Sequence, residues 1–70
     1  MATVTSTMSG TVMRVLVAVG DSVSADQDVV VIESMKMEMM VASTSAGRVK
    51  AVHVAPEDFV QEGQLLLTLE

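Results

Sequence analysis

The clearest chemical signal in this chain is the stretch Glu33–Glu38, which reads ESMKME. A single lysine, Lys36, lies between two methionines, and the methionines lie inside a pair of glutamates. The ammonium group of the lysine must stay in water, whereas methionine is soft and adaptable and often marks a surface that another protein contacts. The pattern therefore predicts one amine, presented at the surface for a partner to reach.

The remaining polar residues do not form a second site. His53, the one histidine, lies in a predicted strand, where we expect a packed or half-exposed structural role. Asp26 with Asp28 is typical of a turn, no cluster of Asp, Glu and His has metal-ligand spacing, and Ser9 lacks the G-x-S-x-G context of a catalytic serine. The absence of cysteine excludes a thiolate nucleophile. We expect no catalytic residue and no metal site.

The composition argues against two classes of partner. Nine acidic residues against four basic ones give a formal net charge of −5, and Phe59 is the only aromatic residue. A nucleic-acid-binding protein needs a basic stripe and usually stacking aromatics, so we expect no nucleic acid. No apolar run approaches the roughly 20 residues of a membrane helix, so we expect no membrane contact either.

The chain is an internal repeat with an offset of 37 residues. Residues 4–33 align with residues 41–70, and 12 of these 30 pairs are identical. An internal repeat constrains the whole fold, so it takes precedence over the assignment of single strands or helices. Two copies of one strand-rich unit predict a pseudo-twofold fold rather than a solenoid, because a solenoid needs at least three repeats.

Each copy predicts four short strands. In the second strand of each copy the apolar spacing is three and then two, which predicts a bulge because a regular strand alternates with period two. Eight short strands with tight turns predict an all-β fold, a small sandwich or flattened barrel. Phe59 and the repeated valines are expected in its core. The predicted strands lie near Val4 and Val41, at 12–17 and 49–54, near Val23 and Val60, and at 29–33 and 65–70.

The repeat also places the lysine. Residues 34–40 join the two copies and have no counterpart within the chain. Their symmetry mate is the gap between Glu70 and Val4, where the termini lie. A twofold axis therefore puts the turn that carries Lys36 at one end of the molecule and both termini at the other.

These residues resemble the biotinyl/lipoyl attachment domain family, specifically its biotin carboxyl carrier type without a thumb. The stretch Glu33–Glu38 resembles the attachment motif of the family. Residues 8–12, 19–23 and 60–65 resemble its opening segment, its next turn and its closing segment. The resemblance covers residues 1–70 as one biotinyl domain. It implies a flattened barrel of two four-stranded antiparallel sheets with quasi-twofold symmetry, with the modified lysine on the hairpin between the halves.

The resemblance further implies a site and its partners. A biotin protein ligase would form biotinyl-adenylate from ATP, and the amine of Lys36 would attack it to form an amide. Because free lysine is protonated near neutral pH, the ligase would remove the proton. The carrier would then shuttle carboxybiotin between a biotin carboxylase and a carboxyltransferase, without catalytic residues of its own. The flanking motif residues, which aid recognition, are Met35, Met37, Glu33, Ser34 and Glu38.

The chain departs from the family pattern in a few places. Asp26 stands in the first half where Gly63 stands in the second, although the family usually has glycine at both positions; Asp tolerates a positive φ better than most residues. Pro56 and Glu57 replace the pair Val19-Gly20, which predicts a different turn type in the second half. Residues 21–33 match their repeat mates without insertion, so no thumb is expected.

Two other functions stay open. One is a lipoyl carrier of a 2-oxoacid dehydrogenase complex, which shares the fold and the lysine position but usually has an acidic residue where this chain has Met35. The other is an unmodified protein-interaction module. The first nine residues are uncharged and unlike a secretion signal. We therefore expect a cytoplasmic location, or the mitochondrial matrix if the chain is part of a larger eukaryotic carboxylase.

Overall fold

The computed structural model describes residues 2–70, which form eight β-strands and no helix. None of these residues therefore lies in a helix that could cross a membrane. Runs rich in valine and other β-branched residues favour strands because their side chains pack well on a pleated surface. The strands are β1 (Ala2–Thr5), β2 (Gly10–Val15), β3 (Ser22–Val23), β4 (Asp28–Ser34), β5 (Met37–Ala42), β6 (Gly47–Val52), β7 (Phe59–Val60) and β8 (Leu65–Leu69).

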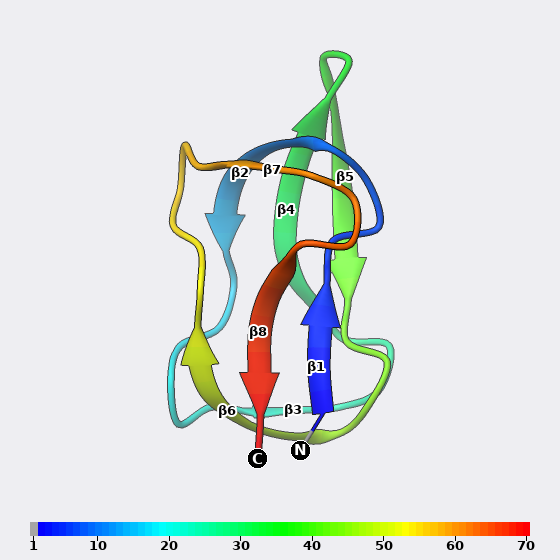
Figure 1. The fold of residues 1–70 in the computed structure, drawn as a ribbon. Coiled ribbons are helices and arrows are strands. Elements are labelled where there is room, and N and C mark those ends of the chain that lie inside the picture. The colour runs from blue at the N-terminus through cyan, green and yellow to red at the C-terminus, as the bar shows by residue number, and fades with distance from the viewer. Residues whose placement is uncertain (1) are drawn as a thin grey trace.

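The strands form two four-stranded antiparallel sheets, ordered β1-β8-β6-β3 and β5-β4-β2-β7 (Figure 1). The expected fold class is confirmed. Each sheet takes its two central strands from one copy of the repeat and its two edge strands from the other. Neither copy can therefore complete a sheet alone, and the two halves are interleaved.

The bulges predicted from the apolar spacing are confirmed in both copies. The register of β2 against β4 shifts between Val12 and Arg14, and the register of β6 against β8 shifts at the equivalent place, between Val49 and Ala51. In the first bulge Met13 and Arg14 are both exposed, whereas Val12 is buried. The bulge thus lets β2 present two consecutive side chains on the outer face of its sheet.

The prediction of different turn types before β3 and β7 was wrong. Gly20 has φ = 96° and its repeat mate Glu57 has φ = 78°, so both lie in the left-handed region. The amide of Gly20 donates to the carbonyl of Val49, and the amide of Glu57 donates to the carbonyl of Val12. These equivalent bonds to the twofold-related strand hold Glu57 in the conformation that glycine adopts more easily.

The turns before β4 and β8 are equivalent too. Asp26 adopts φ = 68° and Gly63 adopts φ = 87°, so the expected tolerance of aspartate for this region is confirmed. Each amide donates to the carbonyl of a buried serine in the other copy, Asp26 to Ser43 and Gly63 to Ser6. The two turns join their strands without inserted residues, so no thumb is present.

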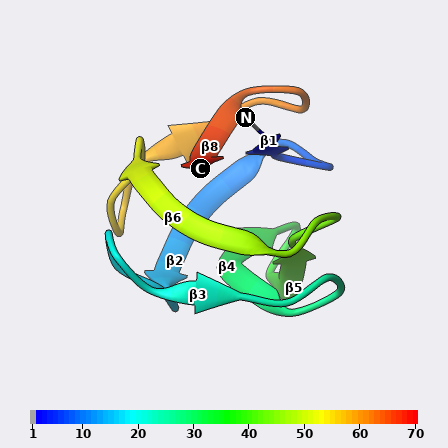
Figure 2. The same ribbon diagram turned by 90° about the horizontal axis from the view of Figure 1, so that it is seen from below.

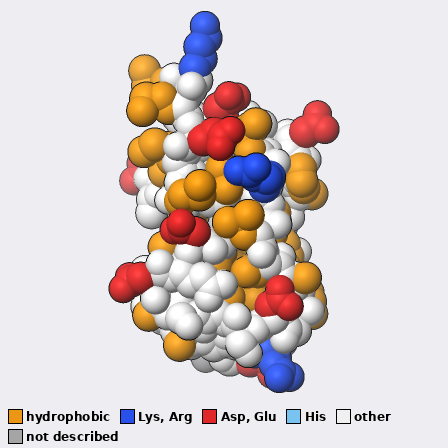
Figure 3. Space-filling view, turned by 180° about the vertical axis from the view of Figure 1, so that it is seen from behind, with side chains coloured by type: hydrophobic (Ala, Val, Ile, Leu, Met, Phe, Trp, Pro, Cys, Tyr) orange, Lys and Arg blue, Asp and Glu red, His pale blue; other side chains and the backbone are white. Residues whose placement is uncertain are grey.

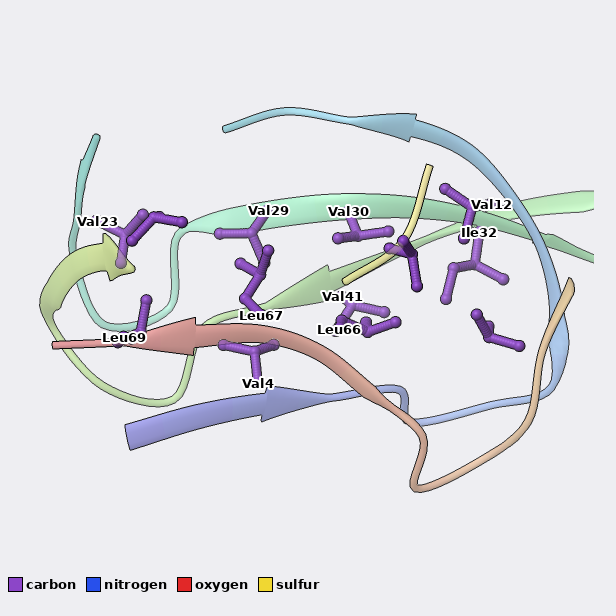
Figure 4. Close-up of a cluster of buried hydrophobic side chains, with 13 residues drawn as sticks. Val4, Val12, Val23, Val29, Val30, Ile32, Val41, Leu66, Leu67 and Leu69 are labelled. Carbon is purple, nitrogen blue, oxygen red and sulfur yellow. The ribbon is translucent and has the colours of Figure 1, made fainter. Parts of the chain in front are cut away.

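The core lies between the two sheets and consists of aliphatic side chains (Figure 4). The repeated valines occupy it in matched pairs, such as Val12 with Val49 and Val23 with Val60. The placement of Phe59 in the core was wrong, because its side chain is 64% exposed. Phe59 precedes the buried Val60 in β7, and adjacent residues of a strand face opposite sides of the sheet.

The hairpin of β4 and β5 and the two termini lie at opposite ends of the molecule (Figure 1), as the symmetry predicted. The principal-axis extents are 31 × 19 × 18 Å. Ala2 pairs with Leu69 at the terminal end, which is the end that faces the viewer in Figure 2. The fold therefore presents the hairpin away from anything joined to either terminus.

Candidate functional site

The tip of the β4–β5 hairpin is a two-residue loop. Ser34 pairs with Met37 across the hairpin, so Met35 and Lys36 are the two central residues of the turn. Their φ values are 53° and 64°. Positive φ at both central residues is the requirement of a type I′ turn, whose twist matches that of the flanking strands.

This turn contains neither of the residues that favour it. Type I′ turns prefer Asn-Gly because non-glycine residues in the left-handed region cost about 1–2 kcal/mol each. Here Met35 and Lys36 occupy both positions. Strain of this kind persists only where the surrounding structure fixes it.

The strand that leads to the turn is firmly anchored. Residues 29–32 of β4 are fully buried, and β4 pairs with β2 on one side and β5 on the other. Gly10 of β2 lies against the base of the hairpin. A Cβ atom at Gly10 would lie 2.7 Å from Cγ2 of Ile32 and closer still to the carbonyl oxygen of Glu33. The glycine therefore permits a close approach that fixes where β4 leaves the body of the protein.

The structure brings the six residues of the predicted motif together at this tip. Met35 and Met37 are 92% and 63% exposed, and the side chain of Lys36 is exposed between them. Glu33 and Glu38 pair directly across the hairpin, one position below the Ser34–Met37 pair, and both are exposed. The predicted arrangement of an exposed amine between two methionines is confirmed. Chemically, this site offers one freely accessible primary amine at the end of a paired hairpin whose first strand is buried at residues 29–32.

Arg14 is a basic neighbour of the motif that the residues around Lys36 do not reveal in the sequence. Nη2 of Arg14 lies 3.7 Å from Oε1 of Glu38, and these side chains are 62% and 51% exposed. An exposed ion pair of this length contributes little to stability. The signal was present in the pairing pattern, because β2 and β5 both flank β4 and the bulge turns Arg14 outward.

The site fits a group attached by a covalent bond and not one held in a cavity. Residues 2–70 enclose no pocket, and they contain no group of three metal-ligating side chains. A cofactor at this tip would therefore be held through the amine of Lys36 alone, which is the donor that amide formation needs. Nothing in the hairpin would bury the cofactor or restrict its movement.

Comparisons with known proteins agree with this geometry. The family model described as "Biotin-requiring enzyme", of the biotin/lipoyl type, matches residues 2–69. The biotin carboxyl carrier protein of Streptococcus mutans is 42% identical over 67 residues, which are 96% of this chain and 52% of that protein. The biotin/lipoyl attachment protein of Bacillus subtilis is 42% identical over 67 residues, 96% of this chain and 92% of that protein. The chain thus spans about half of the first relative and most of the second.

Solved structures give the same fold. The urea carboxylase of Kluyveromyces lactis contains a region that superposes with a TM-score of 0.91 at 33% identity, covering 99% of this chain and 6% of that one. The lipoyl domain of the 2-oxoglutarate dehydrogenase complex of Azotobacter vinelandii superposes with a TM-score of 0.72 at 31% identity, covering 89% of this chain and 78% of that one. This fold is therefore shared with a region of a carboxylase and with a lipoyl domain.

Proposed function

We propose that this chain, which belongs to the biotin-requiring enzyme family, is a biotin carboxyl carrier domain in which Lys36 receives the cofactor as an amide. We further propose that residues 1–70 act as one carrier unit, with no catalytic residue of its own. The observation that carries this proposal is the strained two-residue turn, which holds a freely accessible amine at the end of the molecule opposite both termini.

The residues around the amine have separate roles in this proposal. The left-handed conformation of Met35 and Lys36 makes the loop as short as a hairpin allows, so the amine projects beyond its neighbours. The exposed side chains of Met35 and Met37 supply flexible apolar contacts for whichever protein holds the hairpin. Glu33 and Glu38 place two carboxylates beside the amine for a basic partner to recognise.

When bound, biotin supplies a carrier for the carboxyl group. The fold contributes position to this chemistry. Because the termini lie opposite the tip, a tether at either terminus leaves Lys36 free to reach two enzyme sites in turn, and tethering raises the effective concentration toward mM for short flexible linkers. The partners that we propose are a biotin protein ligase, a biotin carboxylase and a carboxyltransferase, in the cytoplasm or the mitochondrial matrix.

A lipoyl carrier is the main rival, because a lipoyl domain shares this fold. The residue before the lysine separates the two. Met35 is apolar and 92% exposed, whereas the lipoyl pattern places an acidic side chain there. The presence of methionine on both sides of Lys36 favours biotin.

The test is incubation of the purified chain with biotin, ATP and a biotin protein ligase, followed by measurement of the intact mass. We expect the gain of one biotinyl group by the wild-type chain and by Lys50→Arg, and no gain by Lys36→Arg. Lys50→Arg is a matched control because it makes the same change at the only other lysine of the chain.

Parallel incubation with lipoate, ATP and a lipoate ligase tests the rival. Modification by lipoate and not by biotin would replace the proposed function with lipoyl transfer. Modification of Lys36→Arg by biotin would show that the attachment site is wrong. No modification by either ligase, with the fold intact, would favour an unmodified interaction module.

A further inference from the structure

The internal symmetry supplies a control surface for the face that lies below the attachment hairpin. The outer faces of the two sheets have the same backbone arrangement, related by the offset of 37 residues. Where equivalent side chains on the two faces differ in polarity, the backbone fold alone does not account for the difference. The cross-strand pairs give each row of residues on one face an equivalent row on the other.

One row of cross-strand neighbours is more apolar on the sheet that carries the hairpin than on the other sheet. On the β5-β4-β2-β7 sheet the row is Met40, Val31 and Arg14, paired across β5, β4 and β2. On the other sheet the equivalent row, paired across β1, β8 and β6, is hydroxylic and small. Its members are Thr3, Thr68 and Ala51.

The side chains at the two bulges also differ, with the apolar one on the sheet that carries the hairpin. Met13, which is 37% exposed, lies on the hairpin side, and its repeat mate is Lys50. Met40 is 49% exposed. Val31 has no exposed surface although it lies outside the main core cluster, so neighbouring side chains on this outer face cover it. Figure 3 shows hydrophobic side chains gathered below the protruding hairpin, around a basic side chain and beside acidic ones.

We define the hairpin face as the exposed side chains of Met13 and Met40, which lie around the covered Val31, together with the Arg14–Glu38 ion pair. It is continuous with the attachment site, because Glu38 belongs both to this face and to the motif around Lys36. Met40 lies four residues beyond Lys36 in β5, about 14 Å along an extended strand. A standard interface covers about 800 Å² per partner, which is a patch roughly 30 Å across. Such a patch centred on Lys36 therefore reaches Met40.

We propose that the hairpin face is the docking surface for the biotin protein ligase, an inference that rests on the proposed function. The ligase acts on the unmodified lysine, so it must approach within the length of one lysine side chain. The carboxylase and the carboxyltransferase meet the longer modified arm and need no such closeness. A ligase that uses ATP must also hold phosphates with basic groups, which complement the adjacent carboxylates of Glu33 and Glu38.

The experiment measures the steady-state rate of biotin transfer to Lys36 for two matched pairs of variants. Met40→Gln and Thr3→Gln place the same polar side chain on twofold-related edge strands. Met13→Gln and Lys50→Gln do so at the two bulge positions. We expect each methionine variant to lower kcat/KM about tenfold, the size of loss typical of an interface anchor. We expect the loss to appear in KM, since the amine and its support are unchanged.

The opposite-face variants are expected to stay within about twofold of the wild-type chain, as substitutions outside an interface do. Thermal unfolding of all four variants checks that the fold is retained. Equal rates for the methionine variants and the wild-type chain would overturn the docking surface while leaving the proposed function intact. Equal losses on both faces would also overturn it. Failure of the wild-type chain to accept biotin would refute the proposed function and the docking surface together.

Discussion

Replacement of Gly10 by alanine tests whether close packing at the base of the hairpin positions the site. The added Cβ would lie 2.7 Å from Cγ2 of Ile32 and closer to the carbonyl oxygen of Glu33, so backbone or side chain must shift. The repeat supplies the control at Gly47. A Cβ there would lie 3.4 Å from both the carbonyl oxygen of Glu70 and the Cβ of Leu69, and neither contact requires a large shift.

The expected loss of stability follows from the difference in free space at Gly10 and Gly47. Overpacking a dense interior costs about 1–3 kcal/mol, and we expect about 2 kcal/mol for Gly10→Ala. That loss lowers the Tm of a chain of this size by roughly 8–16 °C. Both variants gain equally from the lower entropy of alanine in the unfolded chain, so their difference isolates the clash. Gly47→Ala is expected to change stability by less than about 1 kcal/mol.

Thermal and urea unfolding followed by circular dichroism measure both variants. A native chain of 70 residues has roughly 4–10 kcal/mol of stability, so Gly10→Ala should still fold. Equal stabilities for Gly10→Ala and Gly47→Ala would refute the packing argument. The same result would show that the close approach of Gly10 to β4 does not fix the position of the hairpin.

Five further substitutions test the fold. Met35→Asn places a residue that tolerates positive φ in the turn and should stabilise the chain by roughly 0.5–1 kcal/mol in urea unfolding; no gain would argue against strain at the tip. Phe59→Ser should cost less than about 0.5 kcal/mol and Val60→Ala about 2 kcal/mol, and the reverse order would contradict the orientation of β7. Ser43→Ala and Ser6→Ala each remove a hydroxyl that donates to a backbone carbonyl two residues on. Each should cost about 1–2 kcal/mol, and thermal unfolding that separates the two widely would contradict their equivalence.

Much of the fold could be predicted because the repeat shows which segments, far apart in the sequence, adopt the same structure. The spacing of Val12, Val15 and Val17 predicted a bulge, and the same spacing in the second copy predicted a second bulge at the equivalent place. The second strand of each copy begins and ends two residues earlier than the valine pattern indicated, since β2 spans Gly10–Val15 and β6 spans Gly47–Val52. Val17 then packs against the core from beyond the end of the strand.

The errors arose where a residue type was read without its repeat mate. Phe59 was expected in the core on hydrophobicity alone, although its mate is Ser22, which is exposed. Glu57 was expected to change a turn type, although hydrogen bonds from the other copy fix that turn. Such long-range bonds depend on how the two copies interleave, which local propensity does not encode.

Part of the candidate site could likewise be predicted from adjacent residues, and part could not. The motif around Lys36 could be predicted from adjacent residues, because side-chain types and spacing alone define it. The hairpin face could not, because Met13, Val31 and Met40 come together only through the pairing of β2, β4 and β5. The repeat comparison of Met13 with Lys50 held a partial signal for this face.

A tryptic map of the chain after incubation with biotin, ATP and a biotin protein ligase shows directly whether Lys36 carries the cofactor. Trypsin cleaves after an unmodified lysine but not after an acylated one. We expect a biotinylated fragment of residues 15–48 that is uncut at Lys36, in place of the fragments 15–36 and 37–48 from the untreated chain. Normal cleavage at Lys36, with biotin absent or on another residue, would show that Lys36 is not the attachment site.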